Sequence, residues 1–182
     1  MLAWCARLAS LGAVTAFDYG YVRAGRRSPD RLPALVAAHR EALAELRGRT
    51  QGPFFLIGKS MGGRIGCHVA LEEQVAGVIC LGYPLKSAST GALRDKVLLE
   101  LRTPALLVQG SRDALCPLDL LEDVRGRMSA PSTLMVVDGG DHSLVVSSKQ
   151  LEMTGDSQQD VNGRVLEAIG RFTAGPIDPS ST

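Results

Sequence analysis

The chain has 182 residues, of which 45% are hydrophobic and 21% are charged. This balance is typical of a globular protein and excludes a disordered or collagen-like chain. Lysine and arginine number 20 against 19 aspartate and glutamate residues, so the net charge of +1 gives no general attraction to nucleic acid or to an anionic membrane. We therefore expect a small-molecule substrate or a protein partner, and neither nucleic acid nor membrane.

Short apolar runs alternate with helical patterns along the chain. Each run contains β-branched or aromatic residues and is closed by Gly, Pro or Asp, which predicts five buried parallel strands. The runs cover residues 13–17, 54–57, 75–81, 105–108 and 134–137. Apolar positions at helical spacing predict helices over residues 2–11, 32–46, 61–72, 93–101, 118–128 and 160–172. The alternation indicates an α/β fold with a mostly parallel sheet.

Glycine and aspartate residues mark the expected ends of the first two helices. Gly12 is the expected stop of the first helix, whereas Asp30 and Gly48 are the expected N-cap and stop of the second. Residues 143–159 are polar and without a period, which predicts a loop. Residues 173–182 are rich in Gly, Pro and Ser and predict a flexible tail after a single domain at residues 1–172.

Two features of the sequence bear on its location in the cell. No apolar run approaches the roughly 18 residues that a membrane-spanning helix needs. The apolar N-terminal residues are interrupted by Arg7 and are not preceded by the basic region of a signal peptide. These features predict a cytoplasmic or nuclear protein.

The motif in the clearest structural context lies at residues 54–63, which read FFLIGKSMGG. A strand runs into G-x-S-x-G and then into a helix, which is the context of a nucleophile elbow. Such an elbow holds Ser60 on a tight, strained turn, and we expect Gly58 and Gly62 to remove side chains that would collide across it. The following helix offers the Met61 backbone N–H as an oxyanion donor. The alternative is a glycine-rich turn that binds an anion or packs tightly.

A nucleophilic serine needs a base, because an unassisted hydroxyl is a weak nucleophile. His142 follows the last predicted strand, so it is expected at the same edge of the sheet as Ser60. The other two histidines are weaker candidates, because His39 falls on the apolar stripe of a predicted helix and His68 lies two turns into the helix after the elbow.

The acid that orients this base is expected after the strand between the serine and the histidine. Asp113 lies there, and the order Ser, Asp, His is the chain order of the α/β-hydrolases, with each residue following a separate strand. Asp138 and Asp141 compete for this role. Asp141 adjoins His142 in sequence, and neighbouring side chains diverge, so we rank Asp113 well ahead of both.

These motifs together resemble the testis-expressed and NSL-complex-subunit-3 type of α/β-hydrolase-like proteins, which are related to dienelactone hydrolases. The resemblance covers nearly the whole chain up to about residue 171. It implies a three-layer α/β-hydrolase sandwich in which Ser60, Asp113 and His142 occupy the triad positions. The matching segments are GKSMGGR at 58–64, GYPL at 82–85, LRD at 93–95, VQGSRD at 108–113 and DHSL at 141–144.

The resemblance also implies a shortened N-terminal part. Proteins of this type carry one or more strands and a His-Gly loop before the first helix, and this loop supplies a second oxyanion N–H. No such loop precedes Trp4. The sheet would then lack the strand that lies between the runs at 13–17 and 54–57. Either these two strands pair directly, in a flavodoxin-like order, or a gap with unpaired backbone groups remains.

The residues predict a serine hydrolase for an ester, thioester or similar small acyl compound, a carboxylesterase-like chemistry that needs no cofactor. No metal is expected, because the four cysteines form no C-x-x-C pair and the three histidines no H-x-x-x-H pair. One alternative is a non-catalytic module that binds a protein partner, since larger members of the family resemble scaffold subunits. Another is a truncated isoform with impaired activity, because loss of one oxyanion donor lowers turnover by roughly 10² to 10³.

Overall fold

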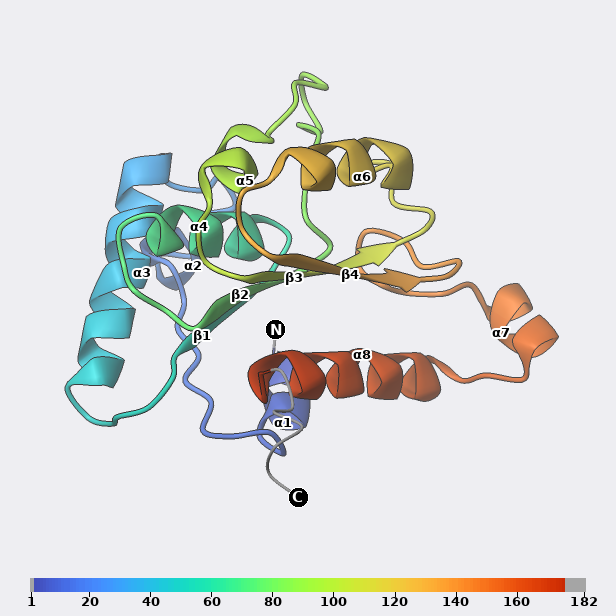
Figure 1. Cartoon of the computed structure of the whole chain (residues 1–182), viewed down its shortest axis with the longest axis horizontal. Coiled ribbons are helices and arrows are strands. Elements are labelled where there is room, and N and C mark those ends of the chain that lie inside the picture. Colours follow the sequence, from blue (N-terminus) through green and yellow to red (C-terminus); the bar gives the residue numbers. More distant parts are fainter. Residues whose placement is uncertain (1, 176–182) are drawn as a thin grey trace.

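The computed structural model describes residues 2–175, which contain a four-stranded parallel sheet in the order β1-β2-β3-β4 (Figure 1). The strands are β1 (Phe55–Lys59), β2 (Gly77–Leu81), β3 (Ala105–Gly110) and β4 (Ser132–Val137). The helices are α1 (Leu2–Leu8), α2 (Gly20–Arg23), α3 (Leu32–Arg47), α4 (Met61–Ala70), α5 (Lys96–Glu100), α6 (Leu118–Arg127), α7 (Ser148–Thr154) and α8 (Gln158–Thr173). The predicted α/β class with a parallel sheet is confirmed.

Helices cover both faces of the sheet (Figure 1). The strand side chains are buried in two clusters, one on each face. On one face, α4, α5 and α6 pack against strand residues such as Val78 and Leu107. On the other face, α1 and α8 pack against the alternate residues Ile79 and Leu106. Every residue of β2 and β3 is buried, as expected for central strands that are covered on both faces. The result is the predicted three-layer arrangement.

The strand predicted at residues 13–17 is not formed, and this prediction is wrong. The segment carries no strand pairing and runs from α1 past the β1 side of the sheet toward α2 (Figure 1). Val14 and Phe17 keep 41% and 36% of their surface exposed. Direct pairing with β1 is therefore also absent, and within residues 2–175 β1 has β2 as its one neighbouring strand. The sheet has four strands and not five.

The predicted N-cap of α3 is also wrong, because Arg31 and not Asp30 occupies that position. The Asp30 carboxylate instead accepts hydrogen bonds from the Tyr21 N–H at 3.1 Å and from the Arg26 guanidinium at 2.6 Å. Asp30 thus ties the turn after α2 to the start of α3. Gly48 follows the last residue of α3, as predicted.

A helix interrupts the segment that was predicted to be a loop. α7 buries none of its residues, so it lacks the apolar stripe by which helices are recognised in a sequence. Its ends are capped instead: the Ser147 hydroxyl accepts from the Gln150 N–H, and Gly155 adopts a left-handed conformation with φ of 69°. The predicted tail at 173–182 begins within α8, and residues 176–182 lie outside the described part.

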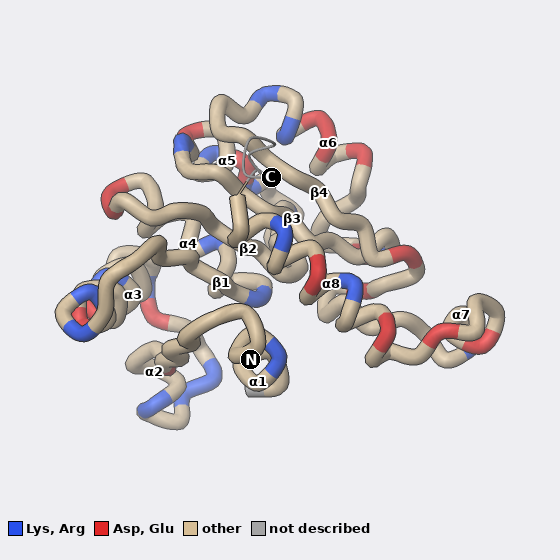
Figure 2. Tube along the Cα trace, turned by 60° about the horizontal axis from the view of Figure 1, so that its bottom comes forward, with Lys and Arg blue, Asp and Glu red and all other residues tan. Residues whose placement is uncertain are grey.

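Charged residues of both signs are interspersed along the trace, for example on α3 and α6 (Figure 2). Several of them pair across elements, as Arg40 and Arg47 of α3 do with Glu73. None of the described helices is long and apolar enough to cross a membrane.

Candidate active site

The sharp turn between β1 and α4 presents Ser60 at the carboxyl edge of the sheet. Ser60 has φ of 52° and ψ of −121°, a backbone conformation that costs a non-glycine residue about 1 to 3 kcal/mol. The Ser60 N–H donates to the carbonyl of Leu81 at 2.9 Å, which anchors the turn to the neighbouring strand. The strained turn that the sequence predicts is therefore present.

Glycine is required in this turn at Gly58, as predicted, and at Gly63 instead of the predicted Gly62. A Cβ atom at Gly58 would overlap the backbone of Gly62 and Gly63. A Cβ atom at Gly62 would meet open space, so the expected steric role of Gly62 is wrong. Gly63 has the second tight position, because its Cβ atom would lie 2.8 Å from the Gly58 carbonyl oxygen and 3.1 Å from Cys80. Helix α4 can approach β1 and β2 closely because of these two residues.

Ser60, His142 and Asp113 form a continuous hydrogen-bonded chain. The His142 Nε2 atom lies 2.8 Å from the Ser60 Oγ atom, and the His142 Nδ1 atom lies 2.7 Å from the Asp113 Oδ2 atom. The three residues follow β1, β4 and β3, respectively, and so meet at one edge of the sheet. In this geometry the imidazole can accept the serine proton while its other nitrogen donates to the carboxylate.

Asp113 is a buried carboxylate whose oxygens are fully engaged. Its side chain has no exposed surface, and besides His142 it accepts hydrogen bonds from the Gln109 amide at 2.5 Å and from the Leu115 N–H at 2.8 Å. Gln109 is itself held by the Tyr83 N–H, which donates to its side-chain oxygen at 2.9 Å. Gln109 was not identified from the sequence. Its signal was a polar residue in a wholly buried strand, which is expensive unless the residue has a specific partner.

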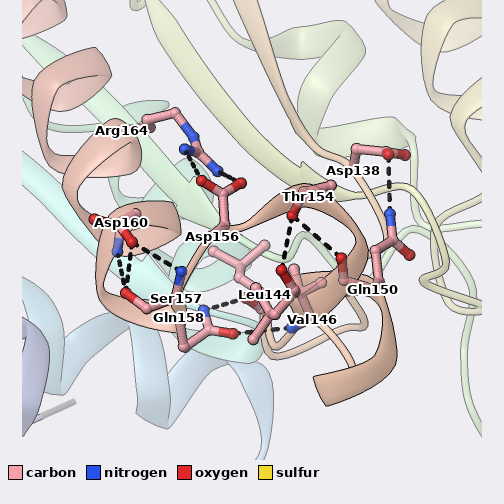
Figure 3. A network of polar contacts seen from close by, with 11 residues as sticks. Asp138, Leu144, Val146, Gln150, Thr154, Asp156, Ser157, Gln158, Asp160 and Arg164 are labelled. Carbon is pink, nitrogen blue, oxygen red and sulfur yellow. Dashed lines mark hydrogen bonds and ion pairs between the residues drawn. The ribbon is translucent and has the colours of Figure 1, made fainter.

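The loop that carries His142 is fixed by close packing and by a neighbouring helix. Gly82 has φ of 67°, and a Cβ atom there would overlap the His142 carbonyl oxygen. Leu144 is buried and also has a positive φ of 64°. Figure 3 shows the Gln158 side chain beside Leu144 and Val146 of this loop, where it donates to the Leu144 carbonyl at 3.0 Å and accepts from the Val146 N–H at 2.9 Å. Gln158 was not identified from the sequence.

The competing acids are engaged elsewhere. Asp138 accepts from the Ser111 hydroxyl at 3.1 Å and from the Gln150 amide at 3.0 Å (Figure 3). Asp141 accepts from the backbone N–H groups of Ser143 and Val145, at 2.7 Å and 2.9 Å. These bonds shape the turn around His142, and neither carboxylate has a hydrogen bond to the imidazole.

The other two histidines lie away from this chain of residues. His39 of α3 packs beside the Tyr19 hydroxyl, and burial lowers the pKa of its imidazole to about 4. Burial, with the nearby positive charge of Arg64, also lowers the pKa of His68. The surroundings favour the neutral form of both imidazoles, and neither has a hydrogen bond to Ser60.

The thiols below the site are kept protonated. Burial, with the nearby charge of Asp113 adding to it, raises the pKa of Cys116 to about 12. The hydrogen bond with Cys67 and burial raise the pKa of Cys80 well above its usual range. A thiol must lose its proton to act as a nucleophile, so these surroundings disfavour Cys80 and Cys116 as nucleophiles.

An open pocket of about 390 Å³ lies beside Ser60. Its walls come from the start of α3, the start of α4 and the loop after β2. The lining residues include Asp30, Leu35, Ser60, Met61, Arg64 and Arg94. Within the described part of the chain, no group of three or more His, Cys, Asp or Glu side chains could hold a metal ion.

The strained turn at Ser60 and the parallel sheet flanked by helices define an α/β-hydrolase fold. The chain belongs to the family described as alpha/beta hydrolase domain, whose family model matches residues 1–174.

Several solved structures share this fold. A putative alpha/beta hydrolase from Agrobacterium tumefaciens is 13% identical, with a TM-score of 0.68 over 96% of this chain and 77% of that chain. Est1E from Butyrivibrio proteoclasticus, with ferulic acid bound, is 17% identical, with a TM-score of 0.61 over 93% of this chain and 83% of that chain. An alpha-beta serine hydrolase homologue from Coxiella burnetii is 19% identical, with a TM-score of 0.58 over 79% of this chain. This chain spans 62% of the length of the Coxiella protein.

Proposed function

We propose that this protein is a serine hydrolase that cleaves an ester, thioester or similar small acyl compound, with Ser60, His142 and Asp113 as its catalytic triad. The observation that carries the proposal is the unbroken chain from the Ser60 Oγ atom through both imidazole nitrogens to a buried carboxylate, with distances of 2.8 Å and 2.7 Å. A histidine held between a serine hydroxyl and a carboxylate is the arrangement that activates a serine nucleophile.

Each step of the proposed reaction can be assigned to one of these residues. The Ser60 Oγ atom forms a bond to the carbonyl carbon while its proton moves to the His142 Nε2 atom. The tetrahedral intermediate then expels the alcohol or thiol, which takes that proton from His142, and an acyl-Ser60 ester remains. Water gives a proton to His142 as it attacks this ester. The second tetrahedral intermediate then releases the acid, and the departing Ser60 Oγ atom takes the proton back from His142. Asp113 fixes the imidazole tautomer and stabilises the imidazolium in both halves of the reaction.

The oxyanion is bound by the start of α4. Met61 is the first residue of this helix, and the N–H groups of the first helical turn have no carbonyl partner within the helix. The Met61 N–H is therefore free to donate to the developing negative charge, and the positive end of the helix dipole adds to the stabilisation. A donor of this kind typically contributes roughly 10² to 10³ to turnover.

The class of substrate is supported by the chemistry of the related folds. The similar structures include an esterase domain from Rhodothermus marinus, Est1E and a monoacylglycerol lipase from Paleococcus ferrophilus. The finer resemblance to the testis-expressed and NSL-complex-subunit-3 type of protein is part of the proposal and does not name a substrate.

Hydrolysis of para-nitrophenyl butyrate tests the proposal. The protein should release nitrophenolate and lose this activity in the Ser60→Ala and His142→Ala variants. Asp113→Asn should lower kcat by roughly 10⁴, because the amide favours the wrong imidazole tautomer. Matched controls are Ser148→Ala at an exposed serine of α7 and His68→Gln, which should both retain activity.

A protein-binding module is the second candidate, and the observation that favours it is the single neighbouring strand of β1. A sheet edge without a partner can accept an added strand from another protein. A folded protein that shows no hydrolysis above the Ser60→Ala variant would favour this candidate and contradict the enzyme.

A further inference from the structure

The pocket beside Ser60 contains an arginine whose charge is not compensated. Arg64 lies one helical turn after Ser60 and lines the pocket together with it. The Arg64 Nε atom is buried and has no hydrogen-bond partner among the described residues. Burial of the guanidinium and the nearby charge of Arg94 both lower the pKa of Arg64. Arg64 as a whole is only partly buried, but its Nε–H group is fully buried. A buried donor without a partner is costly, so this N–H is expected to have a ligand.

A second arginine, Arg94, lines the same pocket. Arg94 lies at the end of the loop after β2, where an isolated bridge joins Lys86 to Leu93. The Arg94 N–H donates to the Leu85 carbonyl at 2.8 Å, and its guanidinium donates to the Ser87 hydroxyl at 3.3 Å. The Arg94 side chain is thus anchored at a neutral group, and its charge remains available.

No carboxylate of the described chain pairs with either arginine. Asp95, the neighbour of Arg94, forms its ion pair with Arg127. Asp30 lines the same pocket, but its charge is paired with Arg26 at 2.6 Å. Two unpaired guanidinium groups therefore face one pocket, and they repel each other until an anion lies between them.

We propose that Arg64 and Arg94 bind a carboxylate of the substrate, so that this hydrolase acts on esters that carry a carboxylate on one of their two parts. The inference rests on the proposed function, since Ser60 provides the chemistry. Arginine suits this role because its planar fork donates two parallel hydrogen bonds to a carboxylate.

The spacing along α4 limits the size of such a substrate. The backbone atoms of Ser60 and Arg64 are one helical turn apart, which is about 6 Å along the axis. Side chains of a helix lean toward its N-terminus, so the Arg64 guanidinium can reach back toward the reacting carbonyl. A chain of about three methylene groups between the ester and the carboxylate spans roughly 5 Å. Monoesters of a short dicarboxylic acid fit these limits.

Pairs of esters that differ in one charge test this inference. Monoethyl glutarate has a carboxylate in its acyl part, and ethyl glutaramate is its neutral amide. Acetoxyacetate has a carboxylate in its alcohol part, and acetoxyacetamide is its neutral amide. We expect kcat/KM for the charged member of at least one pair to exceed that of its amide by about 10- to 100-fold, as for hydrogen bonds to a charged group. The pair that shows the preference identifies the part that carries the carboxylate.

Arginine variants connect this preference to the pocket. Arg64→Gln and Arg94→Gln should each lower the charged-to-neutral ratio of kcat/KM by about tenfold or more, mainly through KM, with little change for the neutral amides. Arg102→Gln is the matched control, because Arg102 is an exposed arginine that follows α5 at the opposite edge of the sheet. Equal ratios in the wild type and in both pocket variants would overturn the inference.

A binding measurement separates this inference from the proposed function. The Ser60→Ala variant cannot turn over the esters, so calorimetry on it gives the Kd for monoethyl glutarate and for ethyl glutaramate directly. Tighter binding of the charged ester, lost in Ser60→Ala/Arg64→Gln, supports the inference. Equal Kd values overturn it even if para-nitrophenyl butyrate is hydrolysed. If para-nitrophenyl butyrate is not hydrolysed, the proposed function is contradicted. The two Kd values then still show whether the pocket binds a carboxylate.

Discussion

The segment at residues 13–17 and strand β3 have similar apolar sequences but opposite structural outcomes. β3 lies between β2 and β4, and all its residues are buried. The segment at 13–17 has no neighbouring strand, and both Val14 and Phe17 are exposed. An apolar run becomes a strand only where its backbone N–H and C=O groups find partners on an adjacent strand.

The candidate site also contains both paired and unpaired regions of the chain. The residues proposed to react come from turns that follow β1, β3 and β4, and each turn is anchored to a paired strand. The N-terminal region contributes a wall of the pocket through Asp30 and the start of α3. We therefore expect changes in the paired region to affect stability and chemistry strongly, and changes in residues 13–17 to affect them little.

The largest effect is expected in the turn that holds Ser60. Gly58→Ala places a Cβ atom against the backbone of Gly62 and Gly63, which cannot move without separating α4 from β1. We expect a loss of about 4 kcal/mol in the free energy of unfolding, measured by urea denaturation, or failure to fold. Gly62→Ala is the matched control, because its Cβ atom meets open space, and it should be neutral or stabilise by up to about 1 kcal/mol. Similar losses in both variants would contradict the assigned packing.

A second pair of variants compares the two regions directly. Leu107→Ala removes a fully buried side chain from β3 and should destabilise by about 2 to 5 kcal/mol. Val14→Ala, in the unpaired segment, should cost less than about 0.5 kcal/mol. Urea denaturation of both variants gives these values. A loss above about 1 kcal/mol in Val14→Ala would indicate that the segment packs as a true part of the core.

The contact between the N-terminal region and α3 should be sensitive to pH. His39 lies against the Phe17 ring and the Tyr19 hydroxyl, and burial lowers its pKa to about 4, below the ordinary value of 6.5. The unfolded chain therefore binds this proton first, and stability falls as the pH drops from 6.5 toward 4.

The loss from this group should reach up to about 3 kcal/mol. It should be absent in His39→Phe, as measured by urea denaturation at pH values across this window. Parallel pH profiles of the wild type and the variant would show that the imidazole is not buried in the neutral form.

The smallest effect is expected at the support of His142. Gln158→Ala removes the side chain that bonds to the backbone of Leu144 and Val146. The loss of these bonds should destabilise the loop by about 1 kcal/mol. We therefore expect the rate at which a fluorophosphonate labels Ser60 to fall by about five- to tenfold. The neighbouring variant Gln159→Ala changes an exposed amide and should react as the wild type does. Equal rates in the two variants would mean that Gln158 does not position the loop.

The sequence allowed prediction of the elements whose signals are local. The four paired strands are short apolar runs closed by turn residues, and the Ser60 turn has a motif with a steric reason. The approach of Ser60, Asp113 and His142 followed from the rule that the carboxyl ends of parallel strands share one edge. Their chain order was sufficient to predict the geometry that the structure has.

The remaining features depend on partners that are distant in the sequence. The strand at 13–17 could not be excluded without knowledge of its neighbours. Gly63 rather than Gly62 is the tight position because the Gly58 carbonyl oxygen and the more distant Cys80 of β2 both lie against it. Helix α7 is stabilised by its caps, and its Ser147 and Gly155 were visible in the sequence but without an apolar stripe to connect them.

Reaction with a fluorophosphonate, followed by peptide mass spectrometry, tests the central claim that Ser60 is an activated nucleophile. We predict covalent labelling on the peptide that contains Ser60, no labelling in Ser60→Ala, and a steep fall in the rate in His142→Ala. Absence of labelling in the folded protein, or labelling that is unchanged in Ser60→Ala, would contradict the claim.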